Sequence, residues 1–168
     1  MNHRGLTLLE AVAIIAVICI LAAVLLPVSV CCPRRQVACL SNLQQLYKLG
    51  TVYAMSYKGE WPDATGKDLW LSFRKMVPPL IAEEHASLLH CSVLDHELGP
   101  DETNYWGPLA PFKRLGIADP LGGDTPGNHG EEYGGNVLFK DGSVQEWERD
   151  HPRWKEYATR PTPSRAPK

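Results

Sequence analysis

Apolar residues are spread unevenly along this chain of 168 residues. Residues 11–30 contain no charged side chain, whereas the sequence from Pro33 onward mixes polar and apolar positions as a water-soluble domain does. About 20 consecutive apolar residues are enough to cross a lipid bilayer as a helix. The pattern therefore predicts a membrane-spanning helix followed by a globular domain.

A second apolar pattern, beyond the span, has the three- and four-residue spacing of an amphipathic helix. Its members are Val37, Leu40, Leu43, Leu46, Tyr47, Gly50, Tyr53, Ala54 and Tyr57, and Lys58-Gly59 then supplies a stop signal. The simplest interpretation is one helix over residues 6–57, roughly 75 Å long at 1.5 Å per residue. The alternative is two helices separated at Pro27 and Pro33.

The remaining sequence predicts a small head made of short elements. We expect helices at residues 68–76 and 80–89, a strand within residues 103–109, and a loop rich in glycine and proline at residues 119–130. From residue 150 the chain is rich in proline and basic side chains, so we expect no regular structure there.

The clearest local signal is a hairpin over residues 135–147. Two strand-like runs flank Asp141-Gly142, a pair that favours a two-residue turn because both turn positions need positive φ. In that register Phe139 faces Val144, and both side chains would pack onto the long helix.

Charge and composition give little support to a nucleic-acid partner. There are 17 basic and 19 acidic residues and a net charge of -2, whereas a nucleic-acid-binding protein normally presents a basic face. Five tryptophans would supply either a stacking surface for sugars or ordinary core packing. They are Trp61, Trp70, Trp106, Trp147 and Trp154.

Three common kinds of N-terminal segment each disagree with residues 1–30 at one point. A cleaved secretory signal has a shorter apolar core and a small-residue cleavage site, which residues 28–30 match poorly. A lipoprotein signal would place a small residue before Cys31, where Val30 stands. A plain membrane anchor does not explain Glu10, because a carboxylate at the edge of an apolar span is costly.

The hexapeptide Gly5-Leu6-Thr7-Leu8-Leu9-Glu10 accounts for that carboxylate. It resembles the processing motif of type IV pilins and type II secretion pseudopilins, usually Gly-Phe-Thr-Leu-Ile-Glu, with Leu6 as the departure. The resemblance implies that a prepilin peptidase cuts between Gly5 and Leu6 and methylates the new Leu6 amine. It also implies that Glu10 acts in assembly by pairing with that amine of a neighbouring subunit, and that Pro27 kinks the helix.

The head resembles a pseudopilin-like family of unknown function that is common in planctomycetes and related bacteria. The motifs that carry this resemblance are Cys39-Leu40-Ser41-Asn42-Leu43, Leu89-His90-Cys91, His129-Gly130 and residues 134–144. The C-terminal family motif maps onto His129, Gly135, Asn136, Asp141 and Gly142. The family often has cysteines at the positions of Cys39 and Cys91, which implies a disulfide between the long helix and the head. Two buried free thiols are the alternative.

These observations predict an α+β, pilin-like fold in which a long N-terminal transmembrane helix packs on a small antiparallel sheet. The expected segments are a leader at residues 1–5, the transmembrane half of the helix at 6–30 and its amphipathic continuation at 31–57. A globular head with the hairpin follows at 58–149, and a tail without regular structure at 150–168.

The resemblance implies a structural filament subunit that supports protein secretion, and not an enzyme. Its expected partners are copies of itself, other pseudopilins, the prepilin peptidase, the inner-membrane assembly platform with its ATPase, and membrane lipid. The N-terminus would be cytoplasmic and the head periplasmic, on a bacterial inner membrane. The alternatives are a type IV pilus subunit for adhesion, motility or DNA uptake, and a membrane-anchored module that binds a wall polymer or a secreted protein.

No residue pattern predicts a bound cofactor. A zinc site drawn from Cys31, Cys32, Cys39, His90 and Cys91 lacks a Cys-x-x-Cys pair. Some pseudopilins bind calcium in a C-terminal loop, which makes Asp124 and Asp141 weak candidates, although the acidic residues here match no calcium-loop spacing.

A catalytic pair of His129 with Asp141 or Ser143 is also conceivable. No nucleophile elbow or phosphate loop accompanies these residues in the sequence. We therefore interpret His129 as a hydrogen-bonding residue of the loop that leads into the hairpin.

Overall fold

The structure is a computed structural model that describes residues 12–18, 33–94, 98–130 and 133–159. The chain divides into two compact units, Met1–Cys31 and Cys32–Lys168. In the first unit, residues 12–18 are helical. Within the described ranges, no helix combines the length and the apolar character needed to span a membrane.

The second unit is built on a four-stranded antiparallel sheet, which confirms the α+β class. Its strands are β1 (Tyr105–Trp106), β2 (Pro120–Asp124), β3 (Gly135–Phe139) and β4 (Val144–Trp147). They lie side by side in chain order, so each strand hydrogen-bonds to the next one along the sequence.

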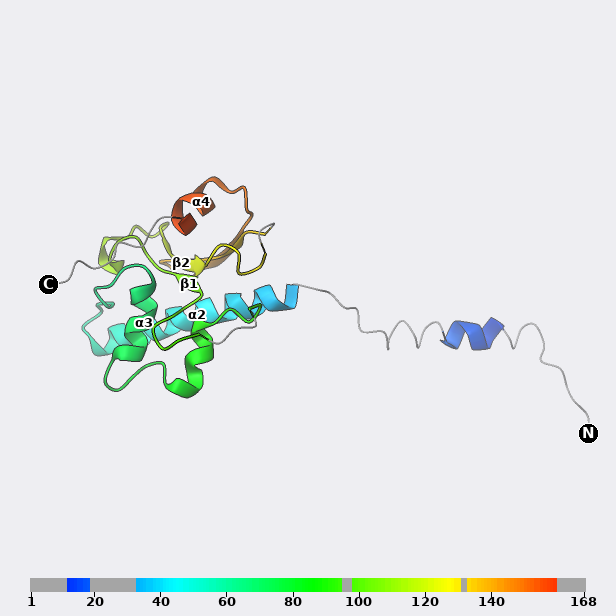
Figure 1. Cartoon of the computed structure of the whole chain (residues 1–168), viewed down its shortest axis with the longest axis horizontal. Coiled ribbons are helices and arrows are strands. Elements are labelled where there is room, and N and C mark those ends of the chain that lie inside the picture. The colour runs from blue at the N-terminus through cyan, green and yellow to red at the C-terminus, as the bar shows by residue number, and fades with distance from the viewer. Residues whose placement is uncertain (1–11, 19–32, 95–97, 131–132, 160–168) are drawn as a thin grey trace, which may run out of the picture. The chain divides into compact units, whose positions relative to one another are not determined.

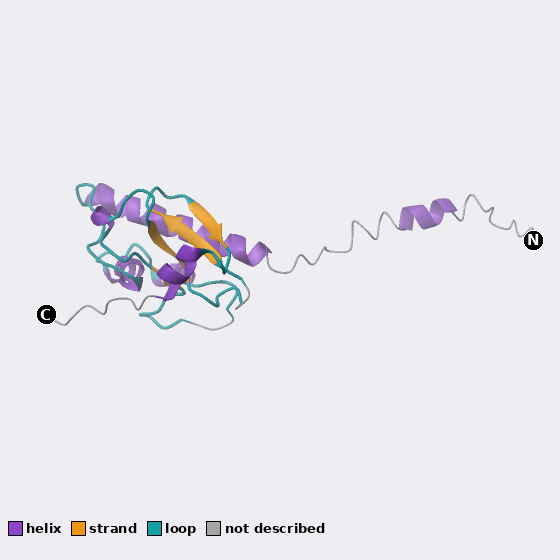
Figure 2. Cartoon of the chain, turned by 90° about the horizontal axis from the view of Figure 1, so that it is seen from above, coloured by secondary structure: helices purple, strands orange, loops and turns teal. Residues whose placement is uncertain are grey.

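Helices cover both faces of this sheet (Figure 1). One face carries α2 (Pro33–Ser56), α3 (Lys67–Lys75) and the 3-10 helix η1 (Glu83–Leu89), and the other carries α4 (Pro152–Thr159). Figure 2 shows the strands lying over α2 when the unit is seen from above. A short 3-10 turn, η2 (Phe112–Arg114), joins the first two strands.

The alternation of side chains along β3 separates two hydrophobic clusters. Leu138 points to the α2 side, where it joins Leu43, Leu46, Trp70 and Phe73 among the buried side chains. Its neighbours point to the α4 side, where Val137, Phe139, Trp147 and Trp154 are buried together. Successive residues of a strand face opposite sides, so one strand serves both clusters.

The C-terminal end of α2 lies where the sequence predicts it. Lys58 and Gly59 have positive φ values of 56° and 84°, and the Gly59 amide donates a hydrogen bond to the Ala54 carbonyl at 2.8 Å. A left-handed residue just past the last turn is a common way to end a helix. At the other end, Pro33 is the first described residue of α2. Residues 19–32 lie outside the described ranges, so the choice between one helix and two stays a prediction.

The short elements of the head follow the sequence closely. α3 confirms the helix expected at residues 68–76, and η1 lies within residues 80–89 but has 3-10 geometry. β1 lies within the strand region expected at 103–109.

The hairpin is present, but its predicted register was wrong by one residue. Leu138, and not Phe139, pairs with Val144. The Phe139 amide donates a hydrogen bond to the Ser143 carbonyl at 2.8 Å, so the loop has three residues, 140–142. A shift of one residue moves a side chain to the other face of a sheet. Phe139 therefore packs on the α4 side, at 5.8 Å from the Trp147 ring, and not onto α2.

The turn chemistry explains the longer loop. Within this loop Gly142 has a positive φ, of 84°, whereas Asp141 does not, and a two-residue turn of the expected type needs positive φ at both. The Asp141 carboxylate instead accepts hydrogen bonds from the Ser143 amide at 2.8 Å and the Ser143 hydroxyl at 2.6 Å. These bonds lower the pKa of Asp141 below its ordinary value.

Residues 120–124 form strand β2, so the expectation of a loop there was wrong. Gly122 and Gly123 lie so close to neighbouring groups that a larger residue would clash. A Cβ on Gly122 would lie 2.5 Å from the Trp70 ring, and one on Gly123 would lie 2.6 Å from the Asn136 carbonyl oxygen. A glycine-rich sequence is read as a turn by default, but here it lets the strand approach a tryptophan and its neighbouring strand.

The expectation of a tail without regular structure from residue 150 was wrong for residues 152–159, which form α4. Trp154 is only 4% exposed and belongs to the second hydrophobic cluster. The Arg153 guanidinium lies over the rings of Trp147 and Tyr157, at 5.8 Å and 5.2 Å from their centres. Burial of an aromatic side chain stabilises this short helix where composition alone predicts none.

Candidate functional site

Two thiols and an imidazole meet in the interior of the second unit. Cys39 comes from α2, Cys91 follows η1, and His129 lies in the connection between β2 and β3. The two sulfur atoms are 3.0 Å apart, and one ring nitrogen of His129 lies with them in a group whose members are all within 4.8 Å of one another. Both cysteines are fully buried, and the His129 side chain is 5% exposed.

Asp124, at the end of β2, holds the imidazole in place. Its Oδ2 lies 2.9 Å from His129 Nε2, and because a carboxylate only accepts, Nε2 is the nitrogen that carries the proton. The same oxygen accepts hydrogen bonds from the Asn136 backbone amide at 2.8 Å and the Asn136 side-chain amide at 2.9 Å. Oδ1 of this fully buried carboxylate has no hydrogen-bond partner among the residues that the structure describes.

A second polar frame positions Cys91. Its backbone amide donates to the side-chain oxygen of Asn104 at 2.9 Å. The Asn104 carbonyl in turn accepts from the Thr125 amide at 3.0 Å and from the Asn128 side chain at 2.7 Å. The loops on either side of the cluster are therefore fixed by hydrogen bonds that do not involve the sulfurs.

The close contacts within the cluster shift the pKa values of its three members in different directions. The hydrogen bond from Cys91 lowers the pKa of Cys39 to about 5, although burial opposes this, while the same contact and burial raise the pKa of Cys91. Burial lowers the pKa of His129, but hydrogen bonds to Asp124 and Cys39 outweigh it and raise the value to about 9. The charge pattern is that of a thiolate on Cys39 beside an imidazolium, which is a strongly polar arrangement for an interior.

Two kinds of chemistry suit such a group: sulfur–sulfur bond formation and the binding of a thiophilic metal ion. Cys39 and Cys91 are free thiols in the structure. Their separation of 3.0 Å is longer than the bond of about 2.05 Å in a disulfide. The structure brings the two predicted cysteines together, and the disulfide itself stays a prediction.

The family motif splits between the two ends of β3. His129, Gly135 and Asn136 gather around Asp124, and a Cβ on Gly135 would lie 2.9 Å from the Asp124 Cβ. Asp141 and Gly142 form the turn at the opposite end of the strand. The structure therefore does not bring Asp124 and Asp141 together as a calcium pair.

The other sequence-based sites are also placed. His129 contacts Asp124, while the Ser143 hydroxyl donates to Asp141 in the turn, so the three residues of the suggested catalytic pairs do not converge. Nε2 of His90, which the sequence offered as a zinc ligand, lies 2.8 Å from the Leu94 carbonyl oxygen. The histidine that groups with Cys39 and Cys91 is His129. Gly5, Leu6, Glu10, Pro27, Cys31 and Cys32 lie outside the described residues or have side chains that are not described.

The central role of Asp124 was missed by sequence reasoning. Its position inside a Gly-Gly-Asp segment indicates a turn, and a lone acidic residue there indicates a solvated loop. The structural basis is the sheet pairing, because an aspartate that ends β2 beside Asn136 can accept from its backbone and side-chain amides.

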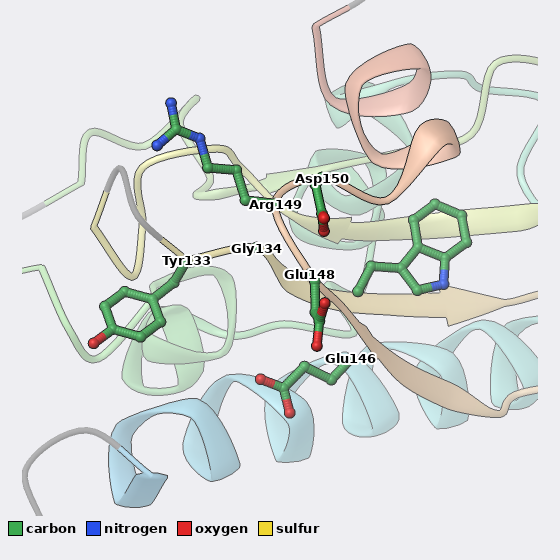
Figure 3. A pocket seen from close by; sticks show the side chains of 7 residues that line it. Tyr133, Gly134, Glu146, Glu148, Arg149 and Asp150 are labelled. Atoms are coloured by element: carbon green, nitrogen blue, oxygen red, sulfur yellow. The ribbon is translucent and has the colours of Figure 1, made fainter.

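A second feature is an open hollow of about 470 Å³ on the surface. It is lined by Tyr133, Gly134, Glu146, Trp147, Glu148, Arg149 and Asp150. Figure 3 shows the Glu146 and Glu148 side chains on the same side of the chain, with Arg149 extending away from them. A shallow surface of mixed charge is typical of a solvated face.

Neither a protein-family model, nor a curated protein, nor a solved structure matches this chain. The functional conclusion therefore depends on the motifs and the geometry of the chain itself.

Proposed function

We propose that this chain is a pseudopilin-like subunit of a type II secretion or related filament. The observation that carries the proposal is the hexapeptide Gly5–Glu10 immediately before an uncharged run of about 20 residues. The motif requires three features together: glycine at the cleavage position, glutamate five residues later and an uninterrupted apolar segment. A plain anchor needs only the last of these.

The described unit supports this proposal through α2. The helix buries Cys39, Leu43 and Leu46 against the sheet, as a stem that carries a head would. On other positions it leaves apolar side chains exposed: Val37 is 61% exposed and Met55 85%. These two residues are 18 positions apart and so lie on the same side of a helix with 3.6 residues per turn. The exposed side chains of Gln44 and Lys48 lie between them on that side, so this face of α2 is mixed and the support comes from its buried face.

The proposed mechanism is assembly without catalysis. A prepilin peptidase removes residues 1–5, the helix waits in the inner membrane, and an assembly platform with its ATPase adds subunits to a periplasmic filament. Within the filament, the Glu10 carboxylate pairs with the Leu6 amine of a neighbour, and a buried charge pair sets register more dependably than it adds stability.

The binding-module alternative receives less support from the tryptophans. Trp61, Trp70, Trp147 and Trp154 are all buried, at 8%, 0%, 5% and 4% exposure. Side chains that pack in the core are not available as a stacking surface for sugars.

The intact mass of the protein tests the proposal most directly. We expect protein from membranes of cells with an active prepilin peptidase to lack residues 1–5 and to carry one added methyl group. Protein from peptidase-deficient cells should be uncut, and so should a Gly5→Val variant in the active strain. An uncut wild-type chain in both strains would contradict the proposal and leave a plain membrane anchor.

A further inference from the structure

We infer that Cys39, Cys91 and His129 form a binding site for one thiophilic metal ion, with Zn²⁺ as the ion of choice. The inference is independent of the proposed function, because it rests on the interior of the head. Three parts of the chain that are distant in sequence each supply one ligand atom, and these atoms lie within 4.8 Å of one another. Two sulfurs and one imidazole nitrogen form a donor set found in zinc sites that have three protein ligands and an open fourth position.

The donor atoms select the class of ion. Thiolate sulfur and imidazole nitrogen favour Zn²⁺ and Cu⁺, whereas Ca²⁺ and Mg²⁺ require oxygen ligands. Two thiolates also match the charge of a divalent cation, so that the ion and the two sulfurs together are neutral.

The arrangement around His129 is the strongest argument for a metal site. Nε2 is occupied by Asp124 at 2.9 Å, which leaves Nδ1 as the ring nitrogen that would bind an ion in place of its proton. Asp124 is in turn fixed by two hydrogen bonds from Asn136. A metal-bound histidine characteristically donates its second N–H to a carboxylate that is itself held by hydrogen bonds. A histidine that served only core packing would not need this chain of partners.

The geometry needs a small adjustment. Two sulfurs bound to a tetrahedral zinc ion at about 2.3 Å lie roughly 3.8 Å apart. The observed separation of 3.0 Å therefore has to increase, whereas a disulfide would require it to decrease. With three protein ligands from the described residues, the fourth position of the tetrahedron falls to water or to another small ligand.

The test uses the full-length protein in detergent, with Cys19, Cys31 and Cys32 replaced by alanine so that thiol counts report on this site alone. The protein is purified under reducing conditions, stripped with EDTA and dialysed against ZnCl₂. We expect one zinc ion per chain and a rise in Tm on zinc binding. Replacement of Zn²⁺ by Co²⁺ should give thiolate-to-metal charge-transfer absorption, a signature that needs no variant.

Matched variants assign the ligands. Cys39→Ser and His129→Gln should abolish stoichiometric binding, and Asp124→Asn, which acts through His129, should weaken zinc affinity about 10- to 100-fold. His85→Gln, at an exposed histidine outside the cluster, should bind zinc as the parent does. Circular dichroism of each apo variant separates loss of a ligand from loss of folding.

Two results would overturn the inference. One is a parent protein with two reduced thiols that binds no zinc and shows no cobalt charge-transfer band. The other is protein isolated from cells with no reactive thiol and a mass two hydrogens lower, which would assign the pair to a Cys39–Cys91 disulfide.

Discussion

Asp124 is the residue on which the polar interior of the head depends. It is fully buried, and a single oxygen accepts three hydrogen bonds, from one imidazole and from two donors of Asn136. These three bonds offset part of the cost of burying the carboxylate, and they all go to Oδ2. The same three bonds place His129 beside Cys39, so that one residue couples sheet pairing to the thiol cluster.

We predict that Asp124→Asn lowers the free energy of unfolding of the metal-free protein by about 3 kcal/mol. The asparagine side chain keeps one acceptor oxygen but loses the negative charge. Its NH₂ group would take the buried position of Oδ1, where it would find no acceptor. Urea unfolding in EDTA, followed by tryptophan fluorescence, measures the change.

Asp63→Asn serves as the control, because Asp63 is exposed. That substitution should change stability by no more than about 0.5 kcal/mol. A loss below about 1 kcal/mol for Asp124→Asn would show that the hydrogen bonds around this carboxylate contribute little.

The hairpin shows how an element can be predicted correctly while its register is not. The two strands were evident from alternation, and Asp141-Gly142 indicated the turn. The side-chain bonds from Ser143 to Asp141 favour a three-residue loop, and the whole set of cross-strand pairs shifts with it. Gly142 then has two constraints, a positive φ of 84° and the Tyr47 ring of α2 close by.

Two glycines with the same φ allow these constraints to be separated. Gly59 and Gly142 both have φ of 84°, but a Cβ on Gly59 meets no atom within 4 Å, whereas one on Gly142 would lie 2.6 Å from Tyr47. We predict that Gly59→Ala costs about 1 kcal/mol from backbone strain alone. Gly142→Ala should cost about 2–4 kcal/mol, because overpacking against α2 is added.

Chemical denaturation of both variants makes the comparison. Equal losses of unfolding free energy in the two variants would mean that Tyr47 moves aside freely and that the added Cβ causes no steric clash with α2. Combining Gly142→Ala with Tyr47→Ala should remove the steric part of the destabilisation caused by Gly142→Ala. The part caused by backbone strain should remain.

At the scale of the whole molecule, the proposed function separates insertion from assembly. The apolar run sets insertion, since about 20 uncharged residues suffice for it. Assembly would depend on Glu10, because a carboxylate near the end of the span has a task only when an amine from another subunit is present.

We predict that Glu10→Ala leaves the amount of protein in the membrane unchanged and reduces filament incorporation by at least about tenfold, equivalent to about 1.4 kcal/mol. Sheared filaments quantified against the membrane fraction provide the measurement. Glu84→Ala, an exposed glutamate of the head, is the control and should assemble normally. Normal incorporation of the Glu10 variant would remove the assigned role of this residue.

Local spacing was enough to predict the parts of the fold that depend on neighbouring residues. The stripe from Val37 to Tyr57 predicted the helix that the structure has at those positions, and the Lys58-Gly59 signal predicted its end. The apolar positions of residues 68–76 gave α3. These predictions succeeded because helix periodicity and glycine conformation are properties of a few adjacent residues.

Composition failed where burial decided the structure. The glycines of β2 are there because Trp70 and Asn136 lie against them, and the proline-containing start of α4 is helical because Trp154 reaches the second cluster. Neither contact can be read from the segment itself, since the partner lies on another element.

The sequence by itself determined the apolar run, the resemblance of residues 5–10 to a processing motif, the α+β class, the C-terminal end of α2 and the existence of the hairpin. The tertiary structure alone decided the hairpin register, the two faces of the sheet and the position of His129 beside Cys39 and Cys91, a cysteine pair that the family resemblance had implied. The two cysteines are 52 positions apart in the chain, and their sulfurs lie 3.0 Å apart because α2 packs across the sheet beside the loop after η1. Proximity between distant residues is a product of packing, which sequence spacing does not encode.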